Sequence, residues 1–321
     1  MKKLAVLFAT LLAASSLSAV CTCAAPGTDW PSPLNFDVGV GYREDDVRWN
    51  IANFGNVPNI LSELKWKKLQ MFEVGAEASY VSCRNYAVSL KGDYGYILSG
   101  KNTDADFAGN DRTGMFSLSE NNAGKGYVYD FSGAVGYRVT SNCGRFIGTP
   151  MIGYSISSQH LHQFDGQQIS YAGYIIDEPI QGPTGEPLNS YYTTRWYGPW
   201  IGVEFSARVE SCAYVFGAFE WHLVSYRGAG QHNLRTDIGP FHDHAHGTGY
   251  IITLGGNWEI WNHWSIGVVS NFRYYKTNHG TQTTEFIVQT YDTIDRFEAS
   301  TRFNQAKWKS IDALAIVAWR F

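Results

Sequence analysis

The chain has 321 residues, of which 44% are hydrophobic, 15% aromatic and 17% charged, with a formal net charge of −4. Abundant aromatic and β-branched residues exclude an intrinsically disordered chain, and the slightly acidic balance excludes a basic nucleic-acid-binding protein. Beyond the N-terminus, no stretch reaches the roughly 20 apolar residues that a membrane-spanning helix needs. Low charge, many aromatic side chains and 33 glycines without long apolar runs indicate a transmembrane β-barrel.

Residues 1–25 have the pattern of a secretory signal peptide. Lys2 and Lys3 give a positive start, residues 4–12 are apolar, and small residues follow. Such a segment is too short to anchor a protein in a membrane and is removed during export. We therefore expect Sec-dependent export and a single mature domain over residues 26–321, in a compartment where disulfides can form.

About ten segments with alternating apolar and polar residues follow in chain order. In the first of them, Phe36, Val38 and Val40 share one face, whereas Asp37 and Gly39 share the other. A period of two is that of a β-strand, and in a membrane barrel one face meets lipid while the other meets the lumen. The segments begin near Asn35, Ser62, Tyr86, Gly126, Arg145, Thr193, Tyr214, Gly249, Trp264 and Phe303.

Short joints and long loops alternate between these segments, which is how outer-membrane barrels are built. A soluble β-sandwich also alternates, but it lacks this rhythm and does not need a last strand that ends on an aromatic residue, as this one does at Phe321. We predict an all-β fold, an antiparallel transmembrane β-barrel of about ten strands in the outer membrane. The long loops are expected roughly at residues 53–61, 101–125, 159–192, 228–247 and 279–302.

The inward face of these strands carries charges of both signs. The charged residues are Asp37, Arg43, Glu73, Glu77, Lys91, Asp93, Asp130, Arg138, Glu204, Arg208, Glu220, Glu259, Arg273, Asp312 and Arg320. They either pair across a narrow, closed lumen or line a water-filled pore. Eight strands leave room only for side chains, whereas open porins use about 16 to 18. A barrel of about ten strands is near the closed end of that range.

Three motifs resemble the omptins, a family of ten-stranded outer-membrane proteases. Residues 62–67 (SELKWK) resemble the omptin stretch S-x-L-x-W-K, and residues 195–202 (RWYGPWIG) resemble the start of the omptin sixth strand. Asp104 and Asp106, in the sequence DADF, look like one of the two omptin acidic pairs. The resemblance implies an omptin-like barrel. For activity it requires paired carboxylates and an Asp-x-His element, which together activate a water molecule.

The Asp-x-His element is not found where the resemblance places it. Gln231 and Asn233 occupy those two positions, and His232 falls between them. The enzymatic alternative is an omptin-type endopeptidase in which Asp104, Asp106 and His232 form a rearranged site. Without a histidine partner the two aspartates are better interpreted as solvated loop carboxylates, so we favour a protein that is not an enzyme and needs no cofactor.

Cys83, Cys143 and Cys212 each lie in a predicted short turn. In such a barrel these turns face the periplasm. An internal disulfide is unfavourable because it needs Cα atoms within about 7 Å, and an odd number leaves a thiol for another protein. Buried, inert cysteines are the alternative. The pattern looks like the disulfide-linked envelope of chlamydia-like bacteria, and the chain resembles their Pom (Protochlamydia outer membrane protein) family, which implies a porin-type function.

The strongest metal candidate is the triplet His242, His244 and His246. In an extended loop these alternate residues share one side and can present three imidazoles to a transition metal, although a polar loop with incidental histidines is the favoured interpretation. Aromatic residues such as Tyr192 and Trp196 are expected in the interface girdle. The sequence thus predicts a porin-like or envelope-structural barrel whose partners are outer-membrane lipid or lipopolysaccharide and disulfide-linked envelope proteins, and not nucleic acid.

Overall fold

The computed structural model describes residues 33–141, 145–210, 212–261, 263–290 and 293–320. Outside the described residues lie the predicted signal peptide (1–25), Cys21, Cys23, Cys143 and Phe321. Within the described ranges, no helix has the length and apolar character needed to cross a bilayer.

The described residues form thirteen strands and two 3-10 turns, η2 (Phe54–Asn56) and η3 (Asn110–Arg112). The strands are β1 (Leu34–Ile51), β2 (Ser62–Val81), β3 (Tyr86–Phe107), β4 (Met115–Asn122), β5 (Gly126–Tyr137), β6 (Val139–Thr140), β7 (Phe146–Tyr171), β8 (Tyr174–Pro179), β9 (Asn189–Arg208), β10 (Ala213–Gln231), β11 (Ile238–Trp261), β12 (Trp264–Gln289) and β13 (Ile294–Arg320).

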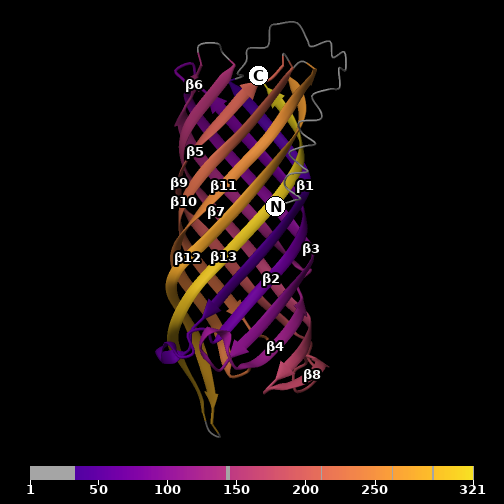
Figure 1. Ribbon diagram of the computed structural model, residues 1–321, viewed down its shortest axis with the longest axis vertical. Coiled ribbons are helices and arrows are strands. Elements are labelled where there is room, and N and C mark those ends of the chain that lie inside the picture. The colour runs from indigo at the N-terminus through magenta and orange to yellow at the C-terminus, as the bar shows by residue number, and fades with distance from the viewer. Residues whose placement is uncertain (1–32, 142–144, 211, 262, 291–292, 321) are drawn as a thin grey trace.

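The strands close into a barrel (Figure 1). β1 pairs in antiparallel fashion with β2 on one side and with β13 on the other. β4 and β5 share one place in the ring, because β3 pairs with β4 along one half and with β5 along the other. The ring therefore has ten strand positions, in the order β1, β2, β3, β4/β5, β7, β9, β10, β11, β12, β13. This confirms the predicted ten-stranded antiparallel barrel.

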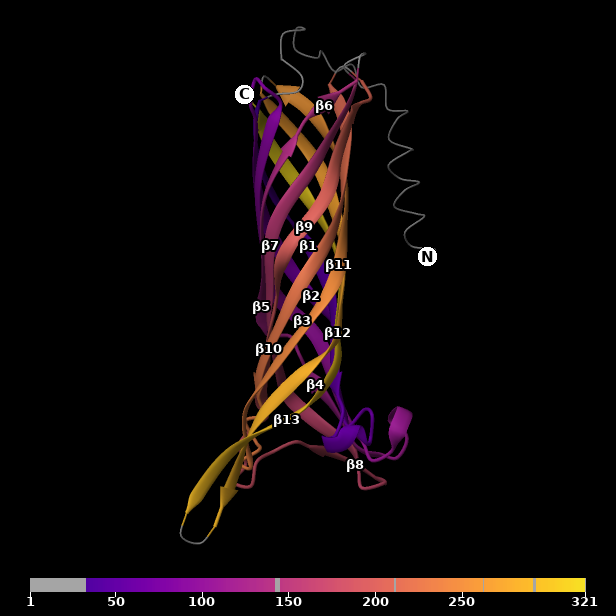
Figure 2. The ribbon, with the colours of Figure 1, turned by 90° about the vertical axis from the view of Figure 1, so that its left-hand side faces the viewer.

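The two ends of the barrel differ. The turn end (upper end in Figure 1) has the short connections at residues 82–85, 209–212 and 262–263. The loop end (lower end) has longer connections, and the β12–β13 hairpin projects beyond the other strands there (Figures 1 and 2). In outer-membrane barrels the short turns face the periplasm, which assigns the turn end to that side.

The predicted long loops were in large part wrong, because strands continue through them. β3 runs to Phe107, β7 to Tyr171 and β12 to Gln289, while β11 already begins at Ile238. Outside the membrane the outward face of a strand no longer has to be apolar, so the alternation that marks a strand in the sequence fades. The backbone hydrogen bonding continues there regardless, and the barrel extends well past the bilayer.

Outward side chains define an apolar band on the turn-end half of the barrel. On β3, for example, the outward Tyr86, Leu90 and Leu98 are each about 60% exposed, whereas the inward Ser89 and Asp93 are buried. An exposed band of this size on a closed barrel is the surface that meets lipid. The membrane-spanning part of β3 thus ends near Leu98.

Introducing a charge in this band should be costly. Val268 lies on the outward face of β12, between Trp264 and Tyr274, with 51% of its surface exposed. We expect Val268→Arg to lower the free energy of unfolding by about 2–4 kcal/mol, the cost of arginine near the bilayer midplane. Urea unfolding in lipid vesicles measures this, with Val268→Leu as control. Equal stability of the two variants would mean that this face does not meet lipid.

Candidate functional site

The candidate site is the lumen, which contains three layers of side chains. Nearest the turn end is a cavity of about 240 Å³, whose lining includes the charged residues Asp37, Glu77, Lys91, Arg138 and Glu204. A layer of ion pairs and then an aromatic layer follow towards the loop end. The chemistry of each layer determines what can pass through the barrel or bind within it.

Arg43 on β1 is the centre of the ion-pair layer and is fully buried. Its Nε donates to Asp45 Oδ1 at 2.8 Å, and its Nη1 donates both to Glu73 Oε1 at 3.0 Å and to Asp130 Oδ2 at 2.5 Å. Asp45 also accepts a hydrogen bond from the indole of Trp308 at 2.9 Å. One guanidinium therefore links strands β1, β2 and β5 through the interior.

Arg273 on β12 forms the second group of ion pairs. Its Nη1 donates to Asp312 on β13, and its Nη2 reaches Asp93 Oδ2 on β3 at 3.4 Å. β3 and β12 are four positions apart in the ring, so the second contact crosses the lumen. Of the two alternatives left open by the sequence, these residues show charges paired inside a narrow lumen.

Nine inward aromatic residues fill the lumen on the loop-end side of the ion pairs, and we call them the aromatic plug. They are Trp49, Trp66, Tyr192, Trp196, Tyr226, Phe241, Tyr275, Phe303 and Trp308. None is more than 4% exposed. They come from seven of the ten strand positions, so the plug is built by the barrel wall itself.

Ring contacts within the plug span the lumen. Trp49 on β1 and Tyr192 on β9 lie on opposite sides of the ring, yet their ring centroids are only 5.2 Å apart. Tyr192 also stacks on Trp66 at 5.7 Å, and Tyr275 stacks on Trp308 at 4.9 Å. Aromatic pairs at these distances are in direct contact, so side chains close the lumen at this level.

The hydroxyls of Tyr192 and Tyr226 have hydrogen-bond partners inside the plug. The Tyr192 hydroxyl donates to Asp243 Oδ2 at 2.6 Å and lies 2.6 Å from the Tyr226 hydroxyl. Gln282 donates to the other oxygen of Asp243 at 2.9 Å. The expectation that Tyr192 and Trp196 join the interface girdle was wrong. Both side chains point inward. Tyr197 points outward, and Trp196 and Tyr192 lie one and five residues before it on β9, so both belong to the opposite, inward face.

Asp104 and Asp106 lie on β3 at the loop end, beyond the apolar band. Burial, followed by the charge of Asp106, raises the pKa of Asp104 to about 8. Burial also raises the pKa of Asp106, while the charge of Arg235 acts in the opposite direction on both groups. Asp104 Oδ1 is buried and accepts no hydrogen bond within the described residues. The two aspartates thus form an acidic pair shielded from water, unlike the solvated carboxylates favoured from the sequence.

His232 is associated with the aromatic plug. Its ring stacks on Phe241 at 5.3 Å, and burial, followed by the charge of Arg235, lowers its pKa to about 4. Asn233 binds the start of β9 instead, since its Oδ1 accepts from the backbone N–H of Asn189 at 2.8 Å and from the Ser190 hydroxyl at 3.1 Å. Asp104 and Asp106 thus lie close together, whereas the charged group that acts on His232 is the cation Arg235.

The structure also gives the positions of Cys83, Cys212 and the three histidines of the metal hypothesis. Cys83 is exposed at the turn end, and Cys212 is buried there. His242, His244 and His246 share the exposed face of β11, which is extended as their metal hypothesis requires. A strand advances about 3.3 Å per residue, so the first and last imidazoles start about 13 Å apart and cannot reach one ion. The extended strand therefore disfavours one site shared by all three histidines.

Sequence reasoning identified the inward charges but missed the plug. The sequence does contain a pattern that predicts it. Trp49 lies six residues after the inward Arg43 on β1, and Trp308 lies four residues before the inward Asp312 on β13, so each shares the inward face of its strand. Both residues lie beyond the apolar band, where the alternation of the sequence was no longer followed. Contacts between strands on opposite sides of a ring leave no pattern in a single sequence.

The closed antiparallel ring, its apolar outer band and its polar and aromatic interior define an outer-membrane β-barrel protein. The Protochlamydia outer membrane protein (Pom) family model matches residues 37–321. The chain belongs to the Pom family. A sequence search among curated proteins gave no significant match.

The fold is similar to that of the outer-membrane protease OmpT from Escherichia coli, with a TM-score of 0.73, 14% identity, and coverage of 90% of this chain and 96% of that one. This similarity confirms the predicted omptin-like barrel fold, and at 14% identity it concerns the fold and not the activity. The Ralstonia pickettii toluene transporter TbuX (TM-score 0.31, 9% identity, 90% of each chain) and the translocator domain of the Neisseria meningitidis autotransporter NalP (0.35, 9%, 98% of each) also match. With TM-scores this low, we draw no conclusion from these two similarities.

Proposed function

We propose that this protein is a structural component of the outer membrane, with a lumen closed to solutes by its own side chains. The contact between Trp49 and Tyr192 across the full width of the ring carries the proposal. The ion pairs of Arg43 add a second barrier next to it. A porin-type role, which the family resemblance suggested, needs an open, wet lumen, and ten strands packed with aromatic rings disfavour one.

A structural role also needs a connection to other envelope proteins, and Cys83 supplies the chemistry. Its side chain is exposed in the tight turn between β2 and β3, at the end of the barrel assigned to the periplasm. Exported proteins can form disulfides, and an accessible thiol there can attack or be attacked by a partner's sulfur. We propose that Cys83 links the barrel to other envelope proteins.

Replacing Cys83 by Ser is therefore expected to remove disulfide-linked forms of high mass. Envelopes are alkylated at once and run on a non-reducing gel, and reductant should collapse the high-mass bands of the wild type to the monomer. Cys212→Ser is the matched control, because Cys212 is buried. A wild-type monomer band without reductant, or unchanged high-mass bands in Cys83→Ser, would refute the cross-linking.

The second candidate is an omptin-type endopeptidase, favoured by the acidic pair Asp104 and Asp106. A carboxyl whose pKa is about 8 beside a second one is an arrangement suited to general acid–base chemistry. The location of His232 weighs against this candidate, since its charged neighbour is Arg235 and its pKa is held low.

Cleavage of a peptide with paired basic residues by the refolded protein tests the enzyme candidate. We expect no cleavage above background from the wild type or from Asp106→Asn. Asp111→Asn, a change in an exposed loop carboxylate at the same end, is the control. Turnover by the wild type and by Asp111→Asn that is lost in Asp106→Asn would establish the protease and displace the structural proposal.

A further inference from the structure

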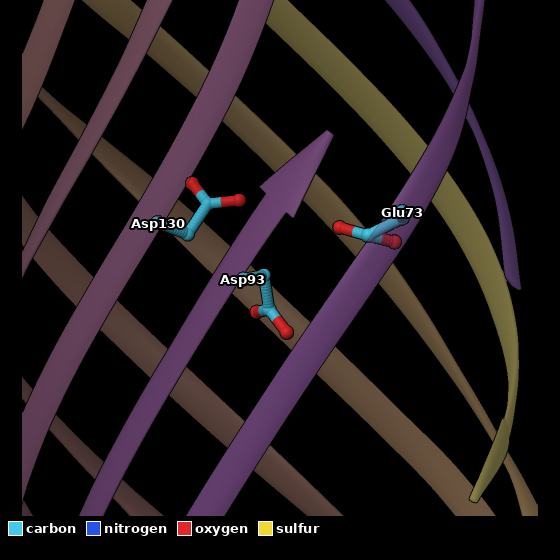
Figure 3. Close-up of side chains that lie close together, drawn as sticks. All are labelled: Glu73, Asp93 and Asp130. Carbon is cyan, nitrogen blue, oxygen red and sulfur yellow. The ribbon is translucent and has the colours of Figure 1, made fainter. Parts of the chain in front are cut away.

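Three inward carboxylates from neighbouring strands converge in the ion-pair layer. Glu73 on β2, Asp93 on β3 and Asp130 on β5 each offer one oxygen, and these three oxygens lie within 4.8 Å of one another. Figure 3 shows Glu73 and Asp130 pointing towards each other, with Asp93 between their strands. Asp93 and Asp130 are also directly opposite in the β3–β5 register. Like charges in that position repel each other, so the sheet needs a compensating positive charge there.

The arginines supply too little positive charge. Arg43 and Arg273 face five carboxylates, those of the three converging residues and of Asp45 and Asp312, which leaves three negative charges in excess. Lys91 adds one positive charge and its register partner Glu77 one negative charge, so the excess stays the same. Isolated charges are strongly disfavoured in a low-dielectric interior.

Unpartnered oxygens in the cluster give an independent indication of a ligand. Glu73 is fully buried, and its Oε1 accepts from Arg43. Its Oε2 is buried and accepts no hydrogen bond within the described residues. Asp130 repeats this pattern, since Oδ2 accepts from Arg43 while the buried Oδ1 accepts none there. Each carboxylate thus binds Arg43 with one oxygen and leaves the other available.

We propose that Glu73, Asp93 and Asp130 bind one divalent cation, calcium, inside the barrel. The donors are hard carboxylate oxygens, the ligands that Ca²⁺ and Mg²⁺ prefer. Calcium binds oxygen at about 2.3–2.6 Å and accepts irregular shells, so its ligands can be about 5 Å apart; magnesium at about 2.0–2.1 Å cannot span more than about 4.2 Å. Asp93 also lines the cavity at the turn end, and water from that cavity completes the shell.

The backbone around the cluster leaves space for this arrangement. Gly75 is the register partner of Asp93, and a Cβ at Gly75 would lie only 2.4 Å from Asp93 Oδ1. A side chain there would push this carboxylate away from its present place. The ion would offset two of the three excess negative charges and join β2, β3 and β5, and a ligand that binds only the folded state stabilises it.

Equilibrium dialysis of the full refolded chain, stripped with EDTA, against radioactive Ca²⁺ tests the proposal. We expect about one tightly bound Ca²⁺ per chain, a higher unfolding temperature with Ca²⁺ than with EDTA, and weaker binding of Mg²⁺. Glu73→Gln should weaken Ca²⁺ binding by at least about tenfold. Glu259→Gln, a change in an inward carboxylate of β11 that lies outside the cluster and near Arg320, should bind like the wild type.

Wild-type protein that binds no stoichiometric Ca²⁺ would overturn the proposal, and protonated carboxylates would then have to account for the charge. Equal binding by Glu73→Gln and the wild type would place the ion elsewhere, for instance at the loops, and would overturn it as well. Heat-modifiable migration on gels verifies folding. If Glu73→Gln fails to fold, Asp93→Asn takes its place, and the wild-type stoichiometry still decides.

Discussion

Arg43→Met is expected to lower the free energy of unfolding by about 3–5 kcal/mol, the cost of removing one partner from a buried ion pair. The change leaves Asp45, Glu73 and Asp130 without the guanidinium that now binds all three. It also removes a cation that lies 5.5 Å from the centre of the Trp308 ring. Equilibrium unfolding in urea, followed by tryptophan fluorescence in lipid vesicles, measures the loss.

Arg48→Met is the matched control for this change, because Arg48 is on the same strand with an exposed side chain. Substitutions at exposed sites usually change stability by less than about 0.5 kcal/mol. Equal stability of Arg43→Met and Arg48→Met would mean that the ion pairs do not hold the lumen together.

Trp196→Ala should cost about 3–5 kcal/mol, as expected for removal of a large side chain from a packed interior. Trp196 is 1% exposed, and its ring centroid lies 4.5 Å from Tyr226, 5.7 Å from Tyr275 and 6.3 Å from Trp308. These partners belong to β10, β12 and β13, so the change leaves a cavity between side chains of several strands.

The same unfolding experiment on Arg195→Ala provides the reference for that prediction. Arg195 is the preceding residue of β9 and points outward. A stability loss at position 196 no larger than at position 195 would show that the aromatic residues are loosely packed and that the plug is not a folded core.

The barrel could be predicted from the sequence because lipid imposes a strict rule on it. Every second residue of a spanning strand faces the bilayer and must be apolar, as at Phe36, Val38 and Val40. This pattern gave the strand number, the antiparallel order and the inward charges. Outside the bilayer the rule no longer applies. β11 and β12 therefore extend through segments that were predicted as loops.

The site could be predicted only in part. The alternation of apolar and polar residues predicts that Arg43, Glu73 and Asp130 point inward. Their mutual contacts depend on how far each strand is shifted relative to its neighbours, and the alternation does not determine this shift. The resemblance to the omptins suggested the pair Asp104 and Asp106, but the sequence placed both residues in a long loop, whereas they lie on β3. The surroundings of His232 could not be inferred, because its neighbour Phe241 comes from the next strand across a loop.

Single-channel recording of the purified, refolded protein in a planar lipid bilayer tests the closed lumen most directly. Folding is first verified by heat-modifiable migration, and a known open porin serves as the positive control. A lumen closed by the Trp49–Tyr192 contact and the ion pairs of Arg43 predicts silent membranes at moderate voltages. Discrete, reproducible conductance steps from folded wild-type protein would contradict it and would establish a pore.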